Sequence, residues 1–308
     1  MTMTDAPVFH PPTLADKPWI DAVLAGTNPI NSVCAFGTVW LWRRLYHTET
    51  AAFDGCMLLR GRGEDGTPYY MYPMGNAYSV RDAVGALRAD AARQGVPLVM
   101  YGVEAWQLNE LTQAFPDTFE AEPARWDCDY IYRSADLIAL EGKKYHAKRN
   151  HIHRFVSLYP DWRYEDIHDA NRDECAAMAA VWMDRALASA DTDAARRREL
   201  LAENAAIVEA LGSIPALGLA GGLLRVGGRV VAMTLGEPLC GDVFDIHFEK
   251  ADTDYEGAYA VINREFAAHR LAGYTYINRE EDLGIEGLRK AKLSYHPVRL
   301  VEKYVVKS

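Results

Sequence analysis

The chain has 308 residues, about twice the length of a typical single domain, which favours two domains or one large one. Apolar residues make up 49% of it and charged residues 25%, a composition typical of globular proteins that excludes disordered and collagen-like chains. Its 33 Lys and Arg against 43 Asp and Glu give a net charge of -10. A contact with nucleic acid or a membrane must therefore come from a local basic patch.

Nothing in the sequence indicates export or membrane insertion. No apolar run approaches the ~18 residues that a membrane-spanning helix needs. Residues 1–5 lack the basic and apolar regions of a secretory signal. The five cysteines are odd in number, lie far apart and form no Cys-x-x-Cys, which indicates reduced thiols rather than a disulfide framework or a zinc ribbon. We therefore expect a cytoplasmic protein.

The first half of the chain shows alternating patterns of helix and strand. Apolar residues at helical spacing and capping residues predict helices, and short β-rich runs between turn signals predict strands. The helices are expected at 13–25, 38–46, 79–94 and 104–115, and the strands at 56–60, 69–72 and 97–103. The stretch 120–133 is irregular and is expected to join two halves.

The second half repeats the alternation. A Gly227-Gly228 turn between two apolar runs predicts a β-hairpin. The helices are expected at 141–158, 172–188, 196–211, 256–272 and 285–293, and the strands at 216–226, 229–236, 243–248, 274–277 and 298–306. The helix at 196–211 has few large apolar residues and is expected to flank the core. We therefore predict two domains, 1–133 and 134–308, each of the α/β (α+β) class.

The segment 142–155 is the most unusual in the sequence, because it carries five Lys or Arg within twelve residues of an acidic chain. On a helix, five residues form one apolar stripe with cations on either side: Tyr145, Ile152, Phe155, Val156 and Tyr159. One interpretation is a solvated basic face that balances acidic charge elsewhere. The other is a site for phosphate or a ribose-phosphate backbone. His151 and His153 lack a third ligand at helical or hairpin spacing, so no metal site is predicted.

A second cluster lies on the strand expected at 243–248. Asp245, His247 and Glu249 alternate onto one face of this strand, whereas Ile246 and Phe248 take the other. If the apolar face meets the core, three titratable groups line one surface of the sheet, which suits proton transfer. The alternative is an ordinary half-solvated strand.

A third cluster follows the strand expected at 274–277. Polar residues that gather where a strand ends are typical of functional sites in α/β folds, and here Asn278, Glu280 and Asp282 do so. Arg289 and Lys292 are three residues apart on the next helix, so they share one face and can hold a single anion together. The alternative is an ion-paired surface helix.

Several common catalytic motifs are missing from the sequence. It contains no Gly-x-x-x-x-Gly-Lys-Ser/Thr, no Gly-x-Gly-x-x-Gly after a strand, no Gly-x-Ser-x-Gly and no His-Glu-x-x-His. P-loop nucleotide hydrolysis, Rossmann dehydrogenation, α/β-hydrolase chemistry and zincin chemistry are therefore excluded.

Two of these segments resemble motifs of the phosphatidylglycerol lysyltransferase C-terminal domain family. Residues 144–155 are similar to its helix with Arg-Asn followed by Asn-Arg-Phe, and 287–297 to its closing Leu-Arg-x-x-Lys-x-x-Phe-x-Pro. A hairpin at 221–236 also stands where that family has one. The resemblance covers about 120–308 well and the first half loosely. It implies two tandem GNAT-like acyltransferase domains with mixed sheets flanked by helices, akin to the Fem-type peptidyl transferases.

The resemblance also implies an activity and roles for single residues. Members of known activity move an aminoacyl group from aminoacyl-tRNA to a lipid hydroxyl or an amine. Lys292 matches the family's functional lysine, with Arg289 in the same motif. Asp245 matches an acid of the lysyltransferases. In those proteins an arginine stands three residues after this acid, whereas this chain has Phe248 at that position. His153 stands where the family often has asparagine.

The first hypothesis is therefore an aminoacyltransferase that uses aminoacyl-tRNA as donor and a small molecule, a peptide or a lipid as acceptor. Cations would stabilise the developing negative charge, and an acid or imidazole would accept a proton. The residues expected in catalysis are Lys292, Asp245, His247 and Glu280. Those expected to bind substrate are Arg289, Asn278, Glu249, Asp282 and Tyr259. Those expected to bind tRNA are Lys144, Lys148, Arg149, Asn150 and Arg154. No cofactor and no metal are expected.

Two alternatives remain from the sequence. An acyl-CoA N-acyltransferase of the same fold would place a pyrophosphate on backbone amides at a helix N-terminus. Asp252, Asp254 and Glu256 stand at that place and would repel it. The other alternative is a catalytically silent binding module, since a fold does not by itself confer an activity.

Overall fold

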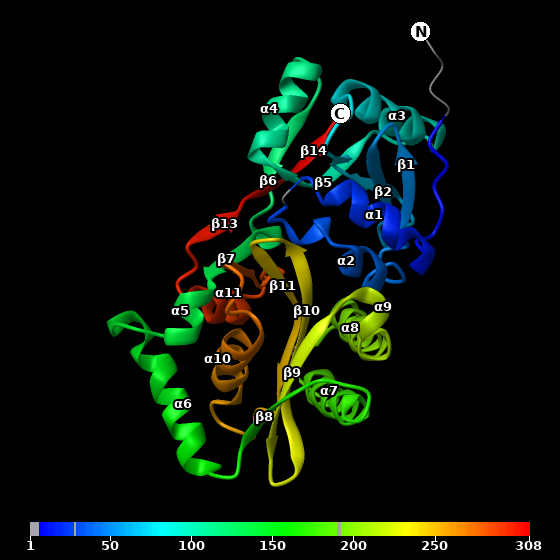
Figure 1. Cartoon of the computed structure of the whole chain (residues 1–308). Helices are drawn as coiled ribbons and strands as arrows, with labels where there is room; N and C mark the ends of the chain where they lie inside the picture. Colours follow the sequence, from blue (N-terminus) through cyan, green and yellow to red (C-terminus); the bar gives the residue numbers. More distant parts are fainter. Residues whose placement is uncertain (1–5, 28, 190–191) are drawn as a thin grey trace. The chain divides into compact units, whose positions relative to one another are not determined.

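The computed structural model describes residues 6–27, 29–189 and 192–308, and it divides into two compact units (Figure 1). The first unit contains the described residues up to Asp129, together with Glu281–Arg289 and Leu300–Ser308. The second contains Tyr130–Glu280 and Lys290–Arg299. This division differs from the expected domains 1–133 and 134–308, because C-terminal segments return to the first unit. Residues 1–5, where no secretory signal was expected, lie outside the described residues.

The first unit is built on a mixed sheet with the strand order β1-β2-β3-β5-β14-β6, in which β4 also pairs with β2. Its strands are β1 (Glu49–Phe53), β2 (Cys56–Arg62), β3 (Pro68–Met71), β4 (Met74–Gly75), β5 (Val99–Glu104), β6 (Glu120–Pro123) and β14 (Lys303–Lys307). Its helical segments are η1 (Leu14–Asp16), α1 (Lys17–Leu24), η2 (Ser32–Cys34), α2 (Phe36–Leu41), α3 (Val80–Arg93), α4 (Ala105–Ala114) and η3 (Arg125–Asp127). Only the pair β3–β5 is parallel among the pairs of this sheet that the described residues form.

Helix α3 shows how local sequence positions an element in this unit. The Ser79 side chain accepts a hydrogen bond from the Asp82 N–H and caps the helix, as the sequence predicts. The apolar residues Val84 and Leu87 are fully buried in one core with Leu58 of β2. Because neighbouring side chains on a strand point to opposite faces, Met57 and Leu59 of β2 are buried on the other face. Both faces of this strand are therefore covered.

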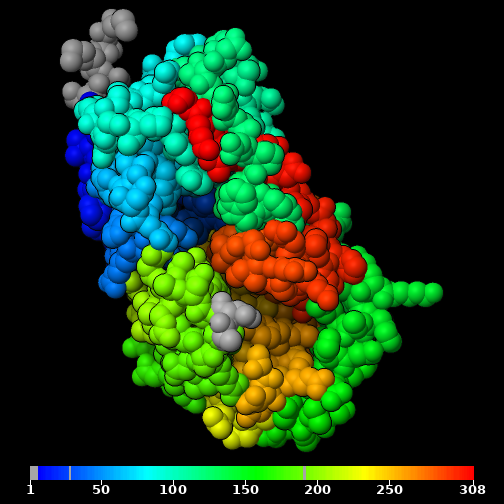
Figure 2. Space-filling model, turned by 180° about the vertical axis from the view of Figure 1, so that it is seen from behind, coloured from blue at the N-terminus to red at the C-terminus, as the bar shows by residue number. Residues whose placement is uncertain are grey.

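The end of the chain is a strand of the first sheet. The predicted strand at 298–306 is interrupted after Val301, and β14 then pairs antiparallel with both β5 and β6. The space-filling view shows these last residues, in red, against cyan and green atoms of the same unit (Figure 2). The stretch 120–133, expected to be irregular, contains β6, whose side chains are all exposed. Backbone pairing with β14 holds β6 in place, so no apolar pattern marks it in the sequence.

The second unit is built on a sheet with the order β13-β7-β12-β11-β10-β9-β8. Its strands are β7 (Asp129–Arg133), β8 (Arg163–Asp166), β9 (Ala220–Val226), β10 (Arg229–Cys240), β11 (Val243–Ala251), β12 (Tyr276–Asn278) and β13 (Arg299–Val301). Its helical segments are α5 (Ser134–Ala139), η4 (Lys143–Tyr145), α6 (His146–Leu158), α7 (Arg172–Leu187), α8 (Ala194–Gly212), α9 (Ile214–Leu217) and α10 (Ala258–Arg270). Helix α11 (Glu286–Leu293) belongs to the first unit up to Arg289 and to the second from Lys290.

Helices cover both faces of the second sheet. Helix α10 packs on β9, β10 and β11 with α5 and α6 beside it, and α7 packs on β10 and β11 from the other side (Figure 1). Helix α8 contacts α7, in line with its predicted place outside the core. The predicted β9–β10 hairpin is confirmed, although 214–217 forms the short helix α9 and not the start of the strand. No helix within the described residues is long and apolar enough to cross a bilayer.

Candidate active site

The candidate site lies where two parallel strands of the second sheet separate. β11 and β12 pair from Val243–Tyr276 to Asp245–Asn278, where their ladder ends. β11 continues to Ala251, whereas β12 gives way to a loop. The carboxyl ends of parallel strands are the usual place for ligands in α/β sheets. The side chains of β11 and of the loop after β12 therefore define the site.

A β-bulge changes which side chains β11 brings together. Leu235 pairs with Phe248 and Gly236 with Ile246, so the backbone of His247 has no pairing partner in the β10 ladder. A side chain at Gly236 would lie 2.0 Å from the Asp245 carbonyl oxygen, so only glycine allows this close approach.

The bulge also corrects a prediction. Asp245, His247 and Glu249 were expected on one face of the strand, but a register shifted by one residue carries Glu249 to the face opposite Asp245. Strict alternation of side chains fails here because His247 is an extra residue that the ladder between β10 and β11 skips.

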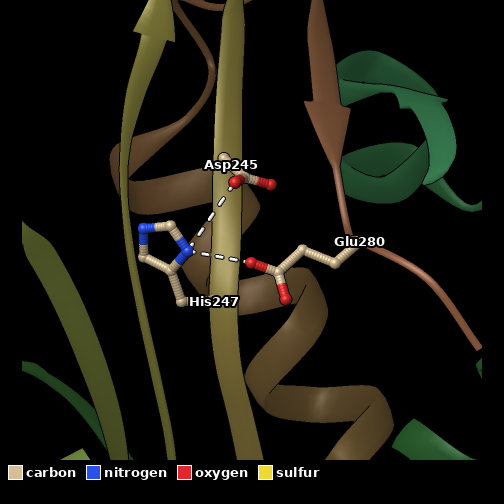
Figure 3. A group of neighbouring side chains, drawn as sticks. All are labelled: Asp245, His247 and Glu280. Atoms are coloured by element: carbon tan, nitrogen blue, oxygen red, sulfur yellow. Dashed lines mark hydrogen bonds and ion pairs between the residues drawn. The ribbon is translucent and has the colours of Figure 1, made fainter. Parts of the chain in front are cut away.

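His247 lies at the centre of a buried group of acids (Figure 3). Its Nδ1 lies 2.9 Å from Glu280 Oε1 and 3.6 Å from Asp245 Oδ2, and its Nε2 lies 3.0 Å from Glu237 Oε1. The imidazole ring is completely buried, whereas the side chains of Glu237 and Glu280 are 5% and 15% exposed. Glu280 is therefore the member of the chain Glu237–His247–Glu280 that solvent reaches best.

The surroundings of His247 favour its charged form. Burial opposes protonation, but the hydrogen bonds with Glu237 and Glu280 and the charge of Asp245 outweigh burial and raise the pKa of His247 well above its usual value. Each ring nitrogen faces a carboxylate oxygen, and only the doubly protonated ring can donate to both. The group can therefore hold a proton between two acids.

The same side chains offer a possible donor set for a metal ion. Ligand atoms of Asp245, His247 and Glu280 lie within 4.8 Å of one another, and one imidazole with two carboxylates is a donor set that divalent metals accept. A metal requires a neutral ring nitrogen, whereas Nδ1 faces two carboxylates that favour its protonation. The geometry thus fits proton holding better than metal binding, and the expected absence of a metal stays a prediction.

We expect His247 to remain an imidazolium at pH 8. Because its pKa is raised on folding, its contribution to stability is complete below about pH 6.5 and is lost as the pH rises through the folded pKa. Nitrogen NMR of protein labelled in its histidines should show two protonated ring nitrogens for His247 at pH 8, with the exposed His153 as reference. A neutral His247 ring at pH 7 would contradict this assignment.

Asn278 and Lys292, two further residues expected in the site, contact the backbone at Glu280. The Glu280 N–H donates to Asn278 Oδ1 at 2.7 Å, and Lys292 Nζ donates to the carbonyl oxygens of Arg279 and Glu280, the latter at 3.3 Å. Glu280 has a φ of +53°, which is strained for a residue with a side chain. Asn278 and Lys292 therefore fix the backbone that presents the Glu280 carboxylate.

Glu249 belongs to a second group on the other face of the sheet. Glu249 Oε1 accepts from Arg279 at 2.7 Å, and its Oε2 accepts from Asn263 of α10 at 3.1 Å. Burial raises the pKa of the nearby Tyr259 to about 12. Arg279 and Glu280 are neighbours in sequence, but Arg279 contacts Glu249 on one face of β11, whereas Glu280 contacts His247 on the other.

Arg289 and Asp282 are bonded to each other in the first unit. Two hydrogen bonds of 2.9 Å join the guanidinium of Arg289 to the carboxylate of Asp282, which also accepts from Arg125 at 2.9 Å. Arg289 and Lys292 were expected to converge on one anion. The structure differs, because the buried Asp282 carboxylate engages Arg289 while Lys292 contacts backbone carbonyls.

Most of the cations expected to bind tRNA have partners within the protein. Lys144 lies 3.7 Å from Asp136, and Arg154 lies 2.8 Å from Glu256. Arg149 donates to the carbonyl oxygens of Leu140 and Gly142, so it stabilises the start of its own segment.

The rest of this helix departs partly from the predicted pattern. Asn150 contacts His146 at 3.1 Å. Val156, expected in the apolar stripe, is 39% exposed, whereas Ile152 and Phe155 are buried as predicted. Lys148 is half-buried, with its Nζ 3.8 Å from the centre of the Tyr295 ring.

Sequence patterns missed two members of the site. Glu237 stands in an apolar strand next to Gly236, and an isolated acid in such a run is the signal that points to it. Arg279 lies between two residues that were singled out, Asn278 and Glu280, and no spacing rule distinguishes it. Its role depends on Glu249, which only the fold brings near.

Comparison with solved structures defines the class of fold. A tandem GNAT protein from the clavulanic acid biosynthesis pathway shares the fold with a TM-score of 0.52 at 10% identity, covering 98% of this chain and 97% of that one. The C-terminal domain of a putative lysylphosphatidylglycerol synthetase from Agrobacterium fabrum aligns with a TM-score of 0.66 at 14% identity, covering 96% and 92%. The predicted fold class, tandem GNAT-like with mixed sheets, is confirmed.

The family follows from the sequence itself. The model of the phosphatidylglycerol lysyltransferase C-terminal family matches residues 27–307, so the chain belongs to that family, as the resemblance implied. A conserved protein of unknown function from Bacteroides thetaiotaomicron is 40% identical, with a TM-score of 0.90 and 99% of each chain covered. No curated protein matches the chain. Family membership supports an acyltransferase-type role.

Proposed function

We propose that the chain transfers an aminoacyl group from aminoacyl-tRNA to a small-molecule, peptide or lipid acceptor. The observation that carries this proposal is the chain Glu237–His247–Glu280 at the point where β11 and β12 separate, in a member of an acyltransferase-type family. An aminoacyl ester is already activated, so its transfer needs orientation, proton removal and charge stabilisation rather than a nucleotide-binding loop.

Glu280 is the proposed proton acceptor. The acceptor amine or hydroxyl attacks the ester carbonyl and gives its proton to the Glu280 carboxylate. The bond between the carbonyl carbon and the ribose oxygen then breaks, and Glu280 returns this proton to the ribose oxygen. His247 Nδ1 lies 2.9 Å from Glu280 Oε1, so the imidazolium orients this carboxylate toward the acceptor. His247 and Asp245 are buried and act through Glu280 as positioning residues.

Lys292 has a positioning role in this proposal. Its ammonium contacts the carbonyl oxygens of Arg279 and Glu280, so it holds the loop that carries the proton acceptor. The family resemblance implies that this lysine is functional. The two contacts suggest how it acts, by holding the backbone next to Glu280.

The geometry at α10 argues against acyl-CoA as donor. A side chain at Gly257, which precedes this helix, would lie 2.4 Å from the His151 carbonyl oxygen of α6. Helix α6 therefore covers the N-terminus where a pyrophosphate would need to approach the backbone amides. Arg185 also holds Asp252 and Asp254 at this place.

We expect acetyl-CoA to leave the melting temperature of the protein unchanged, because its pyrophosphate finds no free space at Gly257 and the nearby Arg185 is already paired with Asp252 and Asp254. Thermal unfolding with increasing acetyl-CoA measures this directly. A crystal structure with CoA ordered on the amides near Gly257 would overturn the ranking of the two donors.

The donor is identified by a parallel assay. The protein is incubated with a pool of labelled aminoacyl-tRNA and cell extract, and separately with labelled acetyl-CoA and the same extract. We expect loss of label from tRNA and its appearance in a product, only with the wild-type protein. The Glu280→Gln variant is the matched control. Consumption of acetyl-CoA alone would favour the N-acyltransferase, and consumption of neither donor would favour a silent binding module.

The exposed cations of 144–154 are the proposed contact with tRNA. Changing Lys144 and Arg154 to glutamate should weaken tRNA binding and lower the slope of log affinity against log salt by about 2, because each phosphate contact contributes about 0.9. Arg149 is left in place, since it caps backbone carbonyls. Filter binding at several salt concentrations tests this. Unchanged affinity and slope would mean that these cations form only a solvated surface.

A further inference from the structure

Lys148 and Arg279 share one aromatic ring in the second unit. Lys148 Nζ lies 3.8 Å from the centre of the Tyr295 ring, and the Arg279 guanidinium lies 4.9 Å from the same centre. Burial, together with the charge of Arg279, lowers the pKa of Lys148 to about 8, although Glu249 partly offsets this. Both cations therefore contact the Tyr295 ring, and the charge of Arg279 acts on Lys148.

One carboxylate accompanies these two cations. One carboxylate oxygen of Glu249 accepts a hydrogen bond from Arg279, and the other accepts one from Asn263. Lys148 forms no ion pair with an acid among residues 6–27, 29–189 and 192–308. The group thus carries one positive charge in excess, and an uncompensated charge that is largely buried is costly.

A second, independent feature points to a missing ligand. The Arg279 Nη1 atom is buried and has no hydrogen-bond partner in the described part of the chain. A buried donor without a partner is rare and indicates a water or an ion that completes it. Water would satisfy the hydrogen bond but not the excess charge, whereas an anion would satisfy both.

We propose that Lys148 and Arg279 form a binding site for a single oxyanion, the phosphate or carboxylate group of a ligand. Such a group accepts hydrogen bonds from a guanidinium and an ammonium together, and these charge-assisted bonds are the strong ones. The Tyr295 ring sets the position of both cations. The place of this anion in catalysis rests on the proposed function, since tRNA donors, lipid acceptors and amino acids all carry such a group, but its binding does not.

The test follows Lys148 itself by NMR of the full chain labelled with ¹³C in its lysines. Inorganic phosphate is the first probe. We expect the Lys148 signal to shift with saturation and its pKa to rise as phosphate binds. Arg279→Gln should weaken phosphate binding, measured on the Lys148 signal, by about 10-fold or more, the effect of losing one charge-assisted hydrogen bond. Lys148→Met removes that signal, so isothermal titration calorimetry measures its phosphate affinity, for which we expect a loss of the same size. Lys143→Gln removes an exposed cation of the same segment and should leave binding unchanged.

Further arms distinguish the source of the anion. A dinucleotide with one phosphodiester represents the tRNA donor, glycerol 1-phosphate a lipid headgroup, and acetate a carboxylate substrate. A Lys148 signal that none of the four probes moves would overturn the proposal, as would equal weakening by Lys143→Gln. The measurement needs no aminoacyl donor and no turnover. If no probe binds, the proposed transfer reaction is not contradicted, and if no transfer is detected, the proposed anion site is not contradicted.

Discussion

Replacing Glu280 by glutamine is expected to lower aminoacyl transfer by about 10²–10⁴-fold, the usual contribution of a general base. The amide keeps the size of the carboxylate and can still accept a hydrogen bond from His247 Nδ1, so the fold should survive. It cannot take a proton from the acceptor at neutral pH. Single-turnover rates with a fixed aminoacyl-tRNA, measured beside urea unfolding, separate the loss of chemistry from a loss of stability.

The control for this variant is Glu286→Gln, which changes an exposed acid at the start of α11. It should retain the wild-type rate. Near-wild-type turnover in Glu280→Gln would remove this residue as the base. The proton would then have to pass to another group, and the completely buried His247 and Asp245 offer no direct contact with substrate.

The site is assigned to the second unit because the first unit fills the equivalent place. β3 and β5 are also parallel and pair only at Tyr70–Met100 and Met71–Tyr101. Beyond that point Asn31 donates to the Gly102 carbonyl oxygen at 3.4 Å, so the unit's own N-terminal segment occupies the position.

The first unit also contains a buried ion pair. Lys303 and Asp129 form a completely buried ion pair of 2.7 Å, to which Ser32 is also hydrogen-bonded. Breaking such a pair is strongly destabilising. It therefore joins the returning strand β14 to the first residue of β7.

Sequence patterns predicted the elements that carry their own signal. The capped helix α3 and the hairpin β9–β10 were found because apolar periodicity and turn residues lie within a short window. Strand β6 was missed because its side chains are exposed and a distant segment pairs with it. Elements defined by non-local pairing leave no periodic trace in the sequence.

The same distinction applies to the site. Alternation along a strand pointed to Asp245, and polar residues at a strand end pointed to Asn278 and Glu280; the structure brings the three to one place. The β-bulge that separates Glu249 from His247 could not be predicted, since it depends on how β10 and β11 pair. Lys148 was grouped with exposed cations of its helix, because nothing in the sequence shows that Tyr295 lies beneath it.

Replacing Lys292 by alanine is expected to lower turnover by about 10²-fold, because a misplacement of about 1 Å at the reacting group can cost that much. The ammonium holds the carbonyl oxygens of Arg279 and Glu280, and the strained φ of Glu280 will relax when those contacts are lost. The Glu280 carbonyl oxygen keeps the Tyr130 N–H at 3.2 Å, whereas the Arg279 carbonyl oxygen loses the ammonium. A buried carbonyl oxygen that loses its donor costs about 1–3 kcal/mol, so stability should also fall.

Comparison with Lys292→Arg separates positioning from simple charge. A planar guanidinium cannot converge on two carbonyl oxygens as a compact ammonium does, so we expect only partial recovery of turnover. Lys290→Ala removes an exposed cation of the same helix and should retain both rate and stability. Rates and urea unfolding are measured for all three variants. If Lys292→Ala keeps its rate while losing stability, the loop does not need this lysine to present Glu280. If Lys292→Arg recovers full turnover, a positive charge alone is sufficient, and the two carbonyl contacts do not position the base.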